Sequence, residues 1–218
     1  MARRTRTRVA ALIVSVLCVA AVGCAPYSRQ ATSRNGATTY QGGTVMSLSV
    51  DTSAFTPLER VEASGTPAAL DSARIPARFA MRAVPGGQNI SIPYSWGDAP
   101  ADAKSFAVVL VDTAPVANRW VHWMVVDIPR DVPSLSGGAS GTPAMPGGAR
   151  ELSNSFGFVG YGGPQPPPGT GRHDYVATVY ALDVETLGLS GTASLDEFER
   201  AVSGRVLASG TCTGFYVR

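Results

Sequence analysis

The sequence predicts a mainly β domain, in which antiparallel strands carry the fold and one short helix accompanies them. The chain holds 24 Gly and 16 Pro among its 218 residues and is only 16% charged. That profile is typical of loop-rich β proteins rather than of helical bundles or disordered chains. Several short apolar or alternating runs are each closed by Gly, Pro or Asp, as strands are. A single segment has the clear apolar spacing of a helix.

The first 23 residues resemble a bacterial export signal. Residues 9–22 form an apolar run of 14 residues interrupted only by Ser15, which is shorter than the roughly 20 residues of a membrane-spanning helix. Four arginines precede this run: Arg3, Arg4, Arg6 and Arg8. The run leads into Ala-Val-Gly-Cys24, which is similar to a lipobox. We therefore expect a lipoprotein signal peptide over residues 1–23 and lipidation of Cys24, with acyl chains such as palmitate. The alternatives are a plain secretory signal and an uncleaved anchor.

The mature chain is expected on the extracytoplasmic face of the cell membrane, held there by the lipid on Cys24. Residues 24–43 are mostly polar and read as a flexible tether, and residues 44–218 form the domain. Removing the signal takes the formal charge from +2 to −2, because the first 23 residues hold four Arg and no acids. A chain near neutrality has no electrostatic footprint for nucleic acid. With Cys18 in the signal and Cys24 lipidated, Cys212 would have no disulfide partner, and we expect it to be a small buried residue rather than a reactive thiol.

Within the domain the strand signals recur in order. We expect strands over residues 45–51, 90–96, 105–112, 120–128, 175–182 and 206–217, with the apolar run 105–112 covered on both faces. Residues 57–71 are ambiguous between a loop and a short helix, and residues 132–148 read as a loop. Residues 194–203 predict the helix, since Ser194 and Glu197 form a capping box and Leu195, Phe198 and Val202 form an apolar stripe.

Two histidines are the only ones in the chain, and both adjoin predicted strands. Strand alternation places His122 on one face with Trp120, Met124, Val126 and Ile128, and Asp112 at the end of its strand. His173 lies where the Gly/Pro-rich segment 160–175 meets its strand. Asp112, His122 and His173 could form a two-His-one-carboxylate metal site, a nucleophilic triad or an anion pocket. We favour the anion pocket, in which Asp112 orients one histidine and raises its pKa so that it stays a hydrogen-bond donor.

Several strings together resemble the phosphatidylethanolamine-binding protein family, in its bacterial Raf-kinase-inhibitor-like branch. GYGGPQPPPGTGRHDY (160–175) is similar to the family signature G-Y-x-G-P-x-P-P-x-G-x-x-H-R-Y, and WVHWMVVDIP (120–129) to W-x-H-W-x-V-x-N-I-P. The strings IPARFA, ISIPYSWGDAP, TVYALDVETLGL and SLDEFERAV resemble the same branch.

This resemblance implies an antiparallel β-sandwich, with a large sheet packed on a smaller one and short peripheral helices. It implies a pocket at one end of the sandwich for phosphate or carboxylate groups, including phospholipid head groups. By motif, His122 and His173 would be the pocket histidines, lined by Trp120 and Tyr175. Gly162, Gly163 and Pro164 would form a stiff rim whose backbone donors point inward.

Three departures from the family pattern stand out. Asp112-Thr-Ala-Pro replaces D-P-D-A-P, one residue shorter and with one Asp fewer; we align Asp112 with the first family Asp, and the other register places it on the intervening Pro. Asp174 replaces an Arg and either weakens an anion pocket or points outward. Asp127 replaces an Asn and is expected to be a surface change.

The favoured function is therefore binding of a small anionic ligand or phospholipid head group, with no catalysis, cofactor or metal. The alternative is an inhibitor or regulator of an extracytoplasmic protease or kinase through an unknown protein partner. A hydrolase that uses the histidine pair is weaker still, because no G-x-S-x-G nucleophile motif is present.

Overall fold

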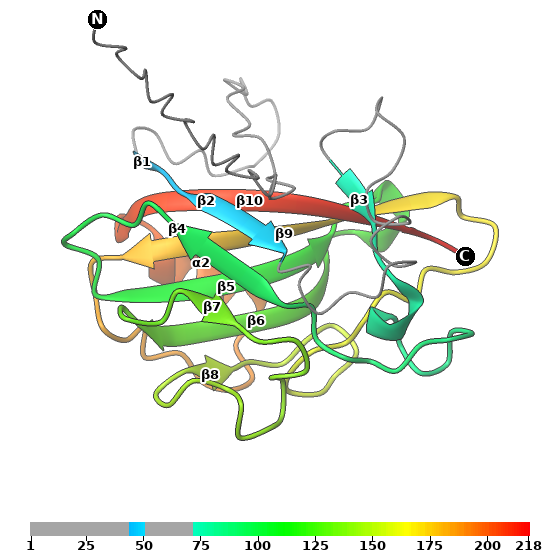
Figure 1. Ribbon diagram of the computed structural model, residues 1–218, viewed down its shortest axis with the longest axis horizontal. Helices are drawn as coiled ribbons and strands as arrows, with labels where there is room; N and C mark the ends of the chain where they lie inside the picture. The colour runs from blue at the N-terminus through cyan, green and yellow to red at the C-terminus, as the bar shows by residue number, and fades with distance from the viewer. Residues whose placement is uncertain (1–43, 51–71) are drawn as a thin grey trace, which may run out of the picture.

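The computed structural model describes residues 44–50 and 72–218, which form two β-sheets packed against each other (Figure 1). The large sheet has the order β1-β10-β9-β5-β6-β8, and β3 also pairs with β10. Its strands are β1 (Thr44–Val45), β3 (Ser72–Arg74), β5 (Ser105–Asp112), β6 (Trp120–Pro129), β8 (Arg150–Glu151), β9 (Arg172–Leu182) and β10 (Val206–Val217). The small sheet has the order β2-β4-β7, with strands β2 (Ser47–Val50), β4 (Tyr94–Gly97) and β7 (Ser134–Leu135).

The predicted fold class is confirmed, with two exceptions to antiparallel pairing. Strands β5, β6, β8, β9 and β10 pair antiparallel with their neighbours in the large sheet, whereas β1 and β3 each run parallel to β10. Two short 3-10 helices, η2 (Ala77–Phe79) and η3 (Pro115–Ala117), and the α-helix α2 (Leu195–Val202) complete the described elements. The predicted signal peptide, the tether and segment 57–71 lie outside the described residues.

Most predicted strands match, and the differences have local causes. The strands over residues 105–112 and 206–217 have the predicted bounds, while β9 begins at Arg172 rather than at Tyr175. β4 is shorter than predicted, because Pro93 has no N–H to offer a ladder and pairing begins only at Tyr94. The loop predicted over residues 132–148 contains the two-residue strand β7.

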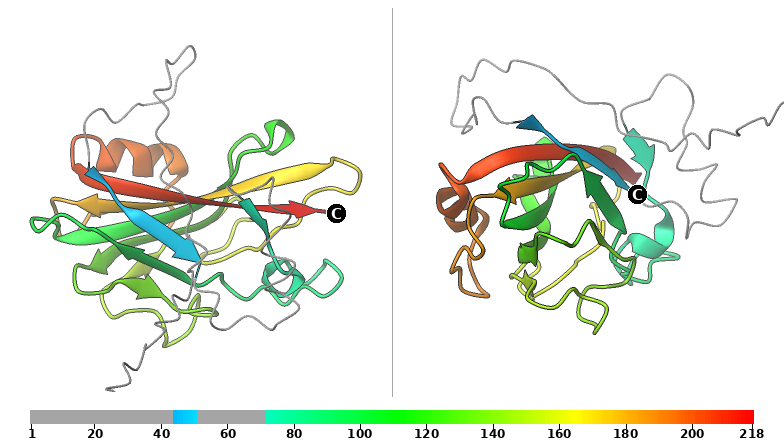
Figure 2. Two further views of the ribbon diagram at one scale, coloured as in Figure 1. Left: turned by 45° about the horizontal axis from the view of Figure 1, so that its top comes forward. Right: turned by 60° about the vertical axis from the view of Figure 1, so that its left-hand side comes forward.

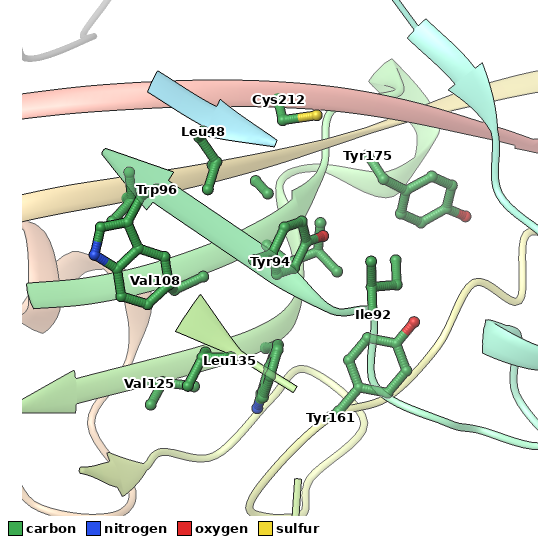
Figure 3. Packing of buried hydrophobic residues seen from close by; sticks show 14 of the residues in the cluster. Leu48, Ile92, Tyr94, Trp96, Val108, Val125, Leu135, Tyr161, Tyr175 and Cys212 are labelled. Atoms are coloured by element: carbon green, nitrogen blue, oxygen red, sulfur yellow. The ribbon is translucent and has the colours of Figure 1, made fainter. Parts of the chain in front are cut away.

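Two apolar clusters cover the two faces of the large sheet. The first lies between the sheets and contains residues of both, including Tyr94, Val125 and Tyr175 (Figure 3). The second lies on the opposite face, where Phe198 and Val202 of α2 pack against the sheet (Figure 2). The strand β5 is therefore buried on both faces, as its apolar run predicts.

The helix α2 begins as the sequence predicts. The Ser194 side chain accepts a hydrogen bond from the backbone N–H of Glu197, and the Glu197 carboxylate accepts one from the backbone N–H of Ser194. This capping box satisfies two of the otherwise orphaned donors at the helix start. The helix is thus placed by its own first turn and by the apolar stripe that it buries.

Cys212 is buried on β10, as expected, but the expectation about its sulfur is wrong. Its side chain belongs to the cluster between the sheets and is 7% exposed. The sulfur is disulfide-bonded rather than a thiol. The reasoning from the sequence assumed that both other cysteines, Cys18 and Cys24, would be unavailable; they lie outside the described residues.

Strand β6 carries two bulges, and these decide which side chains face the site. Leu110 pairs with Trp123 while Val111 pairs with Val121, so His122 is an extra residue on β6. A bulge reverses the alternation of side chains beyond it. Trp123 therefore joins the cluster between the sheets and Met124 joins the opposite one.

The predicted face that grouped His122 with Met124 and Val126 is consequently wrong. A second register shift, between Phe106 and Val108 of β5, returns Ile128 to the cluster between the sheets. Asp127 lies at this second shift with a positive φ of 56°. Asn and Asp tolerate this left-handed conformation better than most side chains.

Candidate functional site

A cavity of about 640 Å³ opens at the end of the large sheet where β5 ends and β6 and β9 begin. Five of the predicted site residues line it: Asp112, Trp120, His122, His173 and Tyr175. The strand pairing explains why they meet, since Asp112 lies opposite both Trp120 and Tyr175 in the ladder. The predicted rim residues Gly162, Gly163 and Pro164 do not line it, and the same loop contributes Gln165, Pro166 and Pro167 instead.

Asp112 and His173 form a buried pair beside this cavity. His173 Nδ1 lies 2.6 Å from Asp112 Oδ2, and the two side chains are 1% and 5% exposed. The other carboxylate oxygen, Oδ1, accepts a hydrogen bond of 2.9 Å from the backbone N–H of Ala114. Asp112 therefore orients His173, and not the nearer residue in the sequence, His122.

The second ring nitrogen of His173 is also engaged. Its Nε2 lies 2.9 Å from Thr170 Oγ1, and that hydroxyl donates to the carbonyl oxygen of Pro167 at 2.7 Å. Because a hydroxyl has one hydrogen, Thr170 must accept from Nε2 when it donates to Pro167. In this arrangement His173 Nε2 donates to Thr170, and its Nδ1 faces the Asp112 carboxylate.

His122 has a different hydrogen-bond environment. Its Nδ1 donates to the carbonyl oxygen of Gly162 at 2.5 Å, and its ring packs edge-on against Tyr175 and Phe156. Burial lowers the pKa of His122 to about 4, against the smaller opposing effects of the Gly162 carbonyl and the Asp112 charge. The ring is therefore neutral at pH 7, and its Nε2 carries a lone pair.

Tyr175 places a hydroxyl in the same cavity. The residue is 1% exposed, and its hydroxyl has no hydrogen-bond partner among the described residues. Burial, and then the negative charge of Asp112, raise the pKa of this phenol well above its usual value, so it stays protonated. The hydroxyl lies near the Asp112 carboxylate. The cavity thus holds an unpartnered donor, Tyr175 Oη, and is lined by the neutral ring of His122.

The Gly/Pro segment supports His122 instead of pointing its donors into the cavity. The N–H of Gly162 donates to the backbone oxygen of His122 at 2.9 Å, and the N–H of Gly163 donates to Asn89 Oδ1 at 2.7 Å. The expectation of inward backbone donors at these two glycines is therefore wrong. A Cβ on Gly163 would lie 1.9 Å from the carbonyl oxygen of Phe79, so only Gly permits this close approach.

Two of the departures from the family pattern are resolved by their surroundings. Asp174 is half exposed and pairs with Arg172 at 2.7 Å on the outer surface, so its side chain points away from the cavity. The prediction that Asp127 is a surface change is wrong, because its side chain is only 8% exposed. It accepts two hydrogen bonds from Arg150, at 2.9 and 2.7 Å, and one of 2.8 Å from the backbone N–H of Leu187.

Among the residues that reasoning from the sequence missed, two contact the predicted histidines directly. Thr170 lies three residues before His173 and bonds its ring, which the turn-forming string PPGTG could have signalled. Phe156 packs on both Trp120 and His122 but lies in a loop without any recognisable pattern. Its place in the site depends on long-range packing.

The mouth of the cavity is apolar and aromatic. Trp120 is 39% exposed, and its ring meets Phe156 edge-on at a centroid distance of 5.3 Å. Val116 is 62% exposed, and Pro166 and Pro167 also line the opening. No Lys or Arg belongs to the lining. A ligand in this cavity would meet polar atoms inside and apolar surface at the mouth.

The described part of the chain holds no helix long and apolar enough to cross a membrane. In residues 44–50 and 72–218, no three His, Cys, Asp or Glu side chains are grouped so that they could hold a metal ion. Asp112 and His173 bind each other directly, and His122 turns its Nδ1 to Gly162.

Comparisons with known proteins agree with this architecture. The sequence model described as "Phosphatidylethanolamine-binding protein" matches residues 65–217. A UPF0098 protein of Aquifex aeolicus is 39% identical over 132 residues, which cover 61% of this chain and 77% of that protein. The Mycobacterium tuberculosis protein named "Putative lipoprotein LppC" is 32% identical over 168 residues, covering 76% of this chain and 79% of its own length.

Solved structures lead to the same family. The crystal structure of Escherichia coli YbcL, described as a member of the mammalian PEBP family, matches with a TM-score of 0.62 at 30% identity. The match covers 66% of this chain and 91% of YbcL. A homologue from Chlamydia trachomatis matches with a TM-score of 0.57 at 28% identity, covering 67% of this chain and 91% of that one. With the family model spanning most of the chain and the two-sheet fold in agreement, this chain belongs to the phosphatidylethanolamine-binding protein family.

Proposed function

We propose that this protein is a lipid-anchored, extracytoplasmic binding protein whose cavity takes a small acidic head group, a phosphate or carboxylate, without catalysis. The observation that carries this proposal is the buried hydroxyl of Tyr175, a donor without a hydrogen-bond partner among the described residues, in a cavity that the ring of His122 also lines. Buried polar atoms normally have partners, and those that lack one often await a ligand or water. The buried Asp112–His173 pair adds a polar wall next to them.

The size and the mouth of the cavity support a ligand larger than a free ion. Ligand pockets commonly measure about 300–1,000 Å³, and this one, at about 640 Å³, falls within that range. The exposed Trp120 and Val116 offer apolar surface just outside the polar groups. A ligand with a polar head group and an apolar portion, as in a phospholipid, fits a cavity with polar groups inside and apolar surface at its mouth.

The membrane anchor rests on the N-terminal sequence and on one relative. The string Ala-Val-Gly-Cys24 follows an apolar signal-like run, and a relative at 32% identity carries the name lipoprotein. Metabolic labelling with palmitate tests this. The wild-type chain is expected to incorporate label and to partition into detergent, and Cys24→Ala is expected to do neither. Equal labelling of the two would overturn the anchor.

The test of ligand binding uses the two histidines as reporters. Since the sequence holds only His122 and His173, their ring signals in NMR can be assigned with one variant each. The mature chain with Cys24→Ser is titrated with phenyl phosphate and with acetate. Saturable shifts of the imidazole signals are expected for at least one of them. Unchanged signals up to millimolar concentration would contradict the proposal.

One observation favours a second candidate, a hydrolase. Asp112, His173 and Thr170 are bonded in the order of an acid–base–nucleophile triad, at 2.6 and 2.9 Å. Two features weigh against it: the Thr170 hydroxyl donates to the Pro167 carbonyl, and Thr170 does not line the cavity. We therefore assign Thr170 to positioning His173. Thr170→Ser should show no hydrolysis of p-nitrophenyl acetate above background. If Thr170→Ser hydrolyses this ester and Thr170→Val does not, the result would favour the hydrolase.

A further inference from the structure

We infer that Asn89 is a positioning residue, which fixes the tautomer of His122 by clamping the Gly/Pro loop from behind. Asn89 lies between η2 and β4 and does not line the cavity. Its role in binding rests on the proposed function, whereas the clamp itself can be measured in the ligand-free protein. The two parts of the inference can therefore fail separately.

The loop around Gly162 has two sides, and His122 binds only one of them. The N–H of Gly162 donates to the backbone oxygen of His122 at 2.9 Å, and the Gly162 carbonyl oxygen accepts from His122 Nδ1 at 2.5 Å. In an extended chain the backbone groups of the neighbouring residues point to the opposite side. These groups are the carbonyl of Tyr161 and the N–H of Gly163, and both meet the side chain of Asn89.

A single amide satisfies both of these backbone groups. Asn89 Nδ2 donates to the Tyr161 carbonyl oxygen at 3.0 Å, and Asn89 Oδ1 accepts from the Gly163 N–H at 2.7 Å. A side-chain amide carries an acceptor and a donor side by side, as the backbone of a neighbouring strand would present them. Asn89 thus takes the place of a strand beside the loop and holds the Gly162 carbonyl against His122.

Asn89 is itself fixed in place. Its φ is 56°, a left-handed conformation that Asn tolerates better than most residues, and its N–H donates to the Ala80 carbonyl oxygen at 2.8 Å. The segment 79–89 binds the loop at a further point, since Tyr161 Oη donates to the Phe79 carbonyl oxygen at 2.8 Å. The position of the loop is therefore set from this segment as well as from the cavity.

The consequence concerns the proton of the His122 ring. The tautomer of a neutral imidazole is set by the hydrogen bond that one of its nitrogens makes. The Gly162 carbonyl oxygen can only accept, so it keeps the proton on Nδ1 and leaves the lone pair on Nε2. Without the clamp the loop no longer enforces this bond, and the proton is free to move to Nε2. The ring that lines the cavity would then offer a donor in place of an acceptor.

The test uses ¹⁵N NMR of the histidine rings in the ligand-free mature chain with Cys24→Ser at pH 7. In this parent chain, His122 Nδ1 should have the shift of a protonated nitrogen and Nε2 that of an unprotonated one. Asn89→Gly keeps the left-handed backbone accessible but removes both side-chain hydrogen bonds, so the two shifts should move toward each other. Asn89→Asp keeps the acceptor for Gly163 and loses the donor to Tyr161, so its shifts should be intermediate.

Asp98→Gly is the matched control. Asp98 also has a positive φ, of 59°, but its side chain is exposed and does not line the cavity. Its His122 shifts should equal those of the parent chain. An unprotonated Nδ1 in the parent chain, unchanged His122 shifts in folded Asn89→Gly, or equal changes in Asp98→Gly would overturn the inference. If Asn89→Gly does not fold, unchanged shifts in Asn89→Asp would overturn it equally.

Calorimetry with phenyl phosphate separates the clamp from the proposed function. Asn89→Gly should bind this probe about five- to tenfold more weakly than the parent chain, as expected when a hydrogen bond that orders the site is lost. Asp98→Gly should change the affinity by less than twofold. A changed tautomer with unchanged affinity would overturn the role of Asn89 in binding. If the parent chain does not bind the probe, the proposed function fails together with that role, whereas the tautomer measurement stands.

Discussion

Two buried carboxylates, Asp127 and Asp112, lie toward opposite ends of the large sheet and show how burial can serve different ends. Asp127, at the bulge of β6, is saturated by two hydrogen bonds from Arg150 and by the backbone N–H of Leu187. Asp112, at the end of β5, binds His173 and the N–H of Ala114 beside a cavity.

The difference lies in the partners. A cation that cannot lose its proton and a backbone donor hold Asp127, so that site has one state. Asp112 is held by an imidazole and lies near a phenol without an acceptor, in contact with a cavity. The contacts of Asp127 connect β6 to Arg150 and Leu187, whereas the surroundings of Asp112 leave a hydrogen-bond donor available to a ligand. Predictions that separate stability from binding test this contrast.

The largest expected effect is the loss of stability in Asp127→Ala. The substitution leaves Arg150 and the Leu187 N–H without their acceptor, and hydrogen bonds to a charged group contribute about 1.5–3 kcal/mol each before solvent relieves the half-exposed Arg150. We expect the free energy of unfolding in urea to fall by about 3 kcal/mol. Asp127→Asn is the matched control and should lose clearly less. The affinity for phenyl phosphate should stay within twofold of the wild type in both variants. Loss of this affinity in a variant that still folds would contradict the difference between Asp127 and Asp112.

Acid should destabilise the fold through His122. Its pKa falls from 6.5 in the unfolded chain to about 4 in the folded protein because burial disfavours the charged ring. Between these values the unfolded chain binds a proton that the folded chain does not. The stabilisation is thus complete above pH 6.5 and is lost as the pH falls toward 4.

At pH 5 this loss should be about 2 kcal/mol relative to pH 7. It is measured as the difference in urea unfolding between the wild type and His122→Gln, which cannot titrate at this position. If the free energy of unfolding depends on pH in the same way in both chains, the folded protein does not hold the His122 ring neutral.

Asp112→Asn should mainly weaken ligand binding, whereas Asp127→Ala should mainly lower stability. The amide keeps the shape but removes the charge that faces His173, and it cannot accept as strongly from the imidazole. We expect phenyl phosphate affinity to fall by about tenfold or more, and the unfolding free energy to fall by about 1–2 kcal/mol. Unchanged affinity in calorimetry would make Asp112 a structural residue like Asp127.

At the mouth of the cavity, Trp120 and Phe158 form a natural pair for a controlled test. Their side chains are similarly exposed, at 39% and 38%, but only Trp120 lines the cavity. Trp120→Ala should weaken phenyl phosphate by about fivefold, consistent with the loss of one aromatic contact of about 1 kcal/mol. Phe158→Ala should change it by less than twofold. Equal losses would mean that the rim acts through general packing.

The smallest effect is expected for Asp174→Arg, which introduces the residue usual in the family. Asp174 and Arg172 are each 45% exposed, and surface ion pairs contribute about 0–1 kcal/mol. Because the side chain points away from the cavity, ligand affinity should stay within twofold at moderate salt. A large gain would show that its charge reaches the ligand.

The sequence by itself determined the local elements and the membership of the site. Apolar runs bounded by turn residues predicted most strands, and Ser194 with Glu197 predicted the helix start, because these signals act over a few residues. The Gly/Pro-rich string that contains His173, together with Asp112 and His122, named the buried polar residues of the cavity.

Only the tertiary structure decided how these residues combine. Asp112 meets His173 across 61 residues of sequence, and the bulge at His122 depends on the register with β5. The burial of Asp127 depends on Arg150 arriving from another strand. Hydrogen-bond partners and side-chain directions in a sheet are set by the pairing of distant strands, so a single strand's sequence cannot specify them.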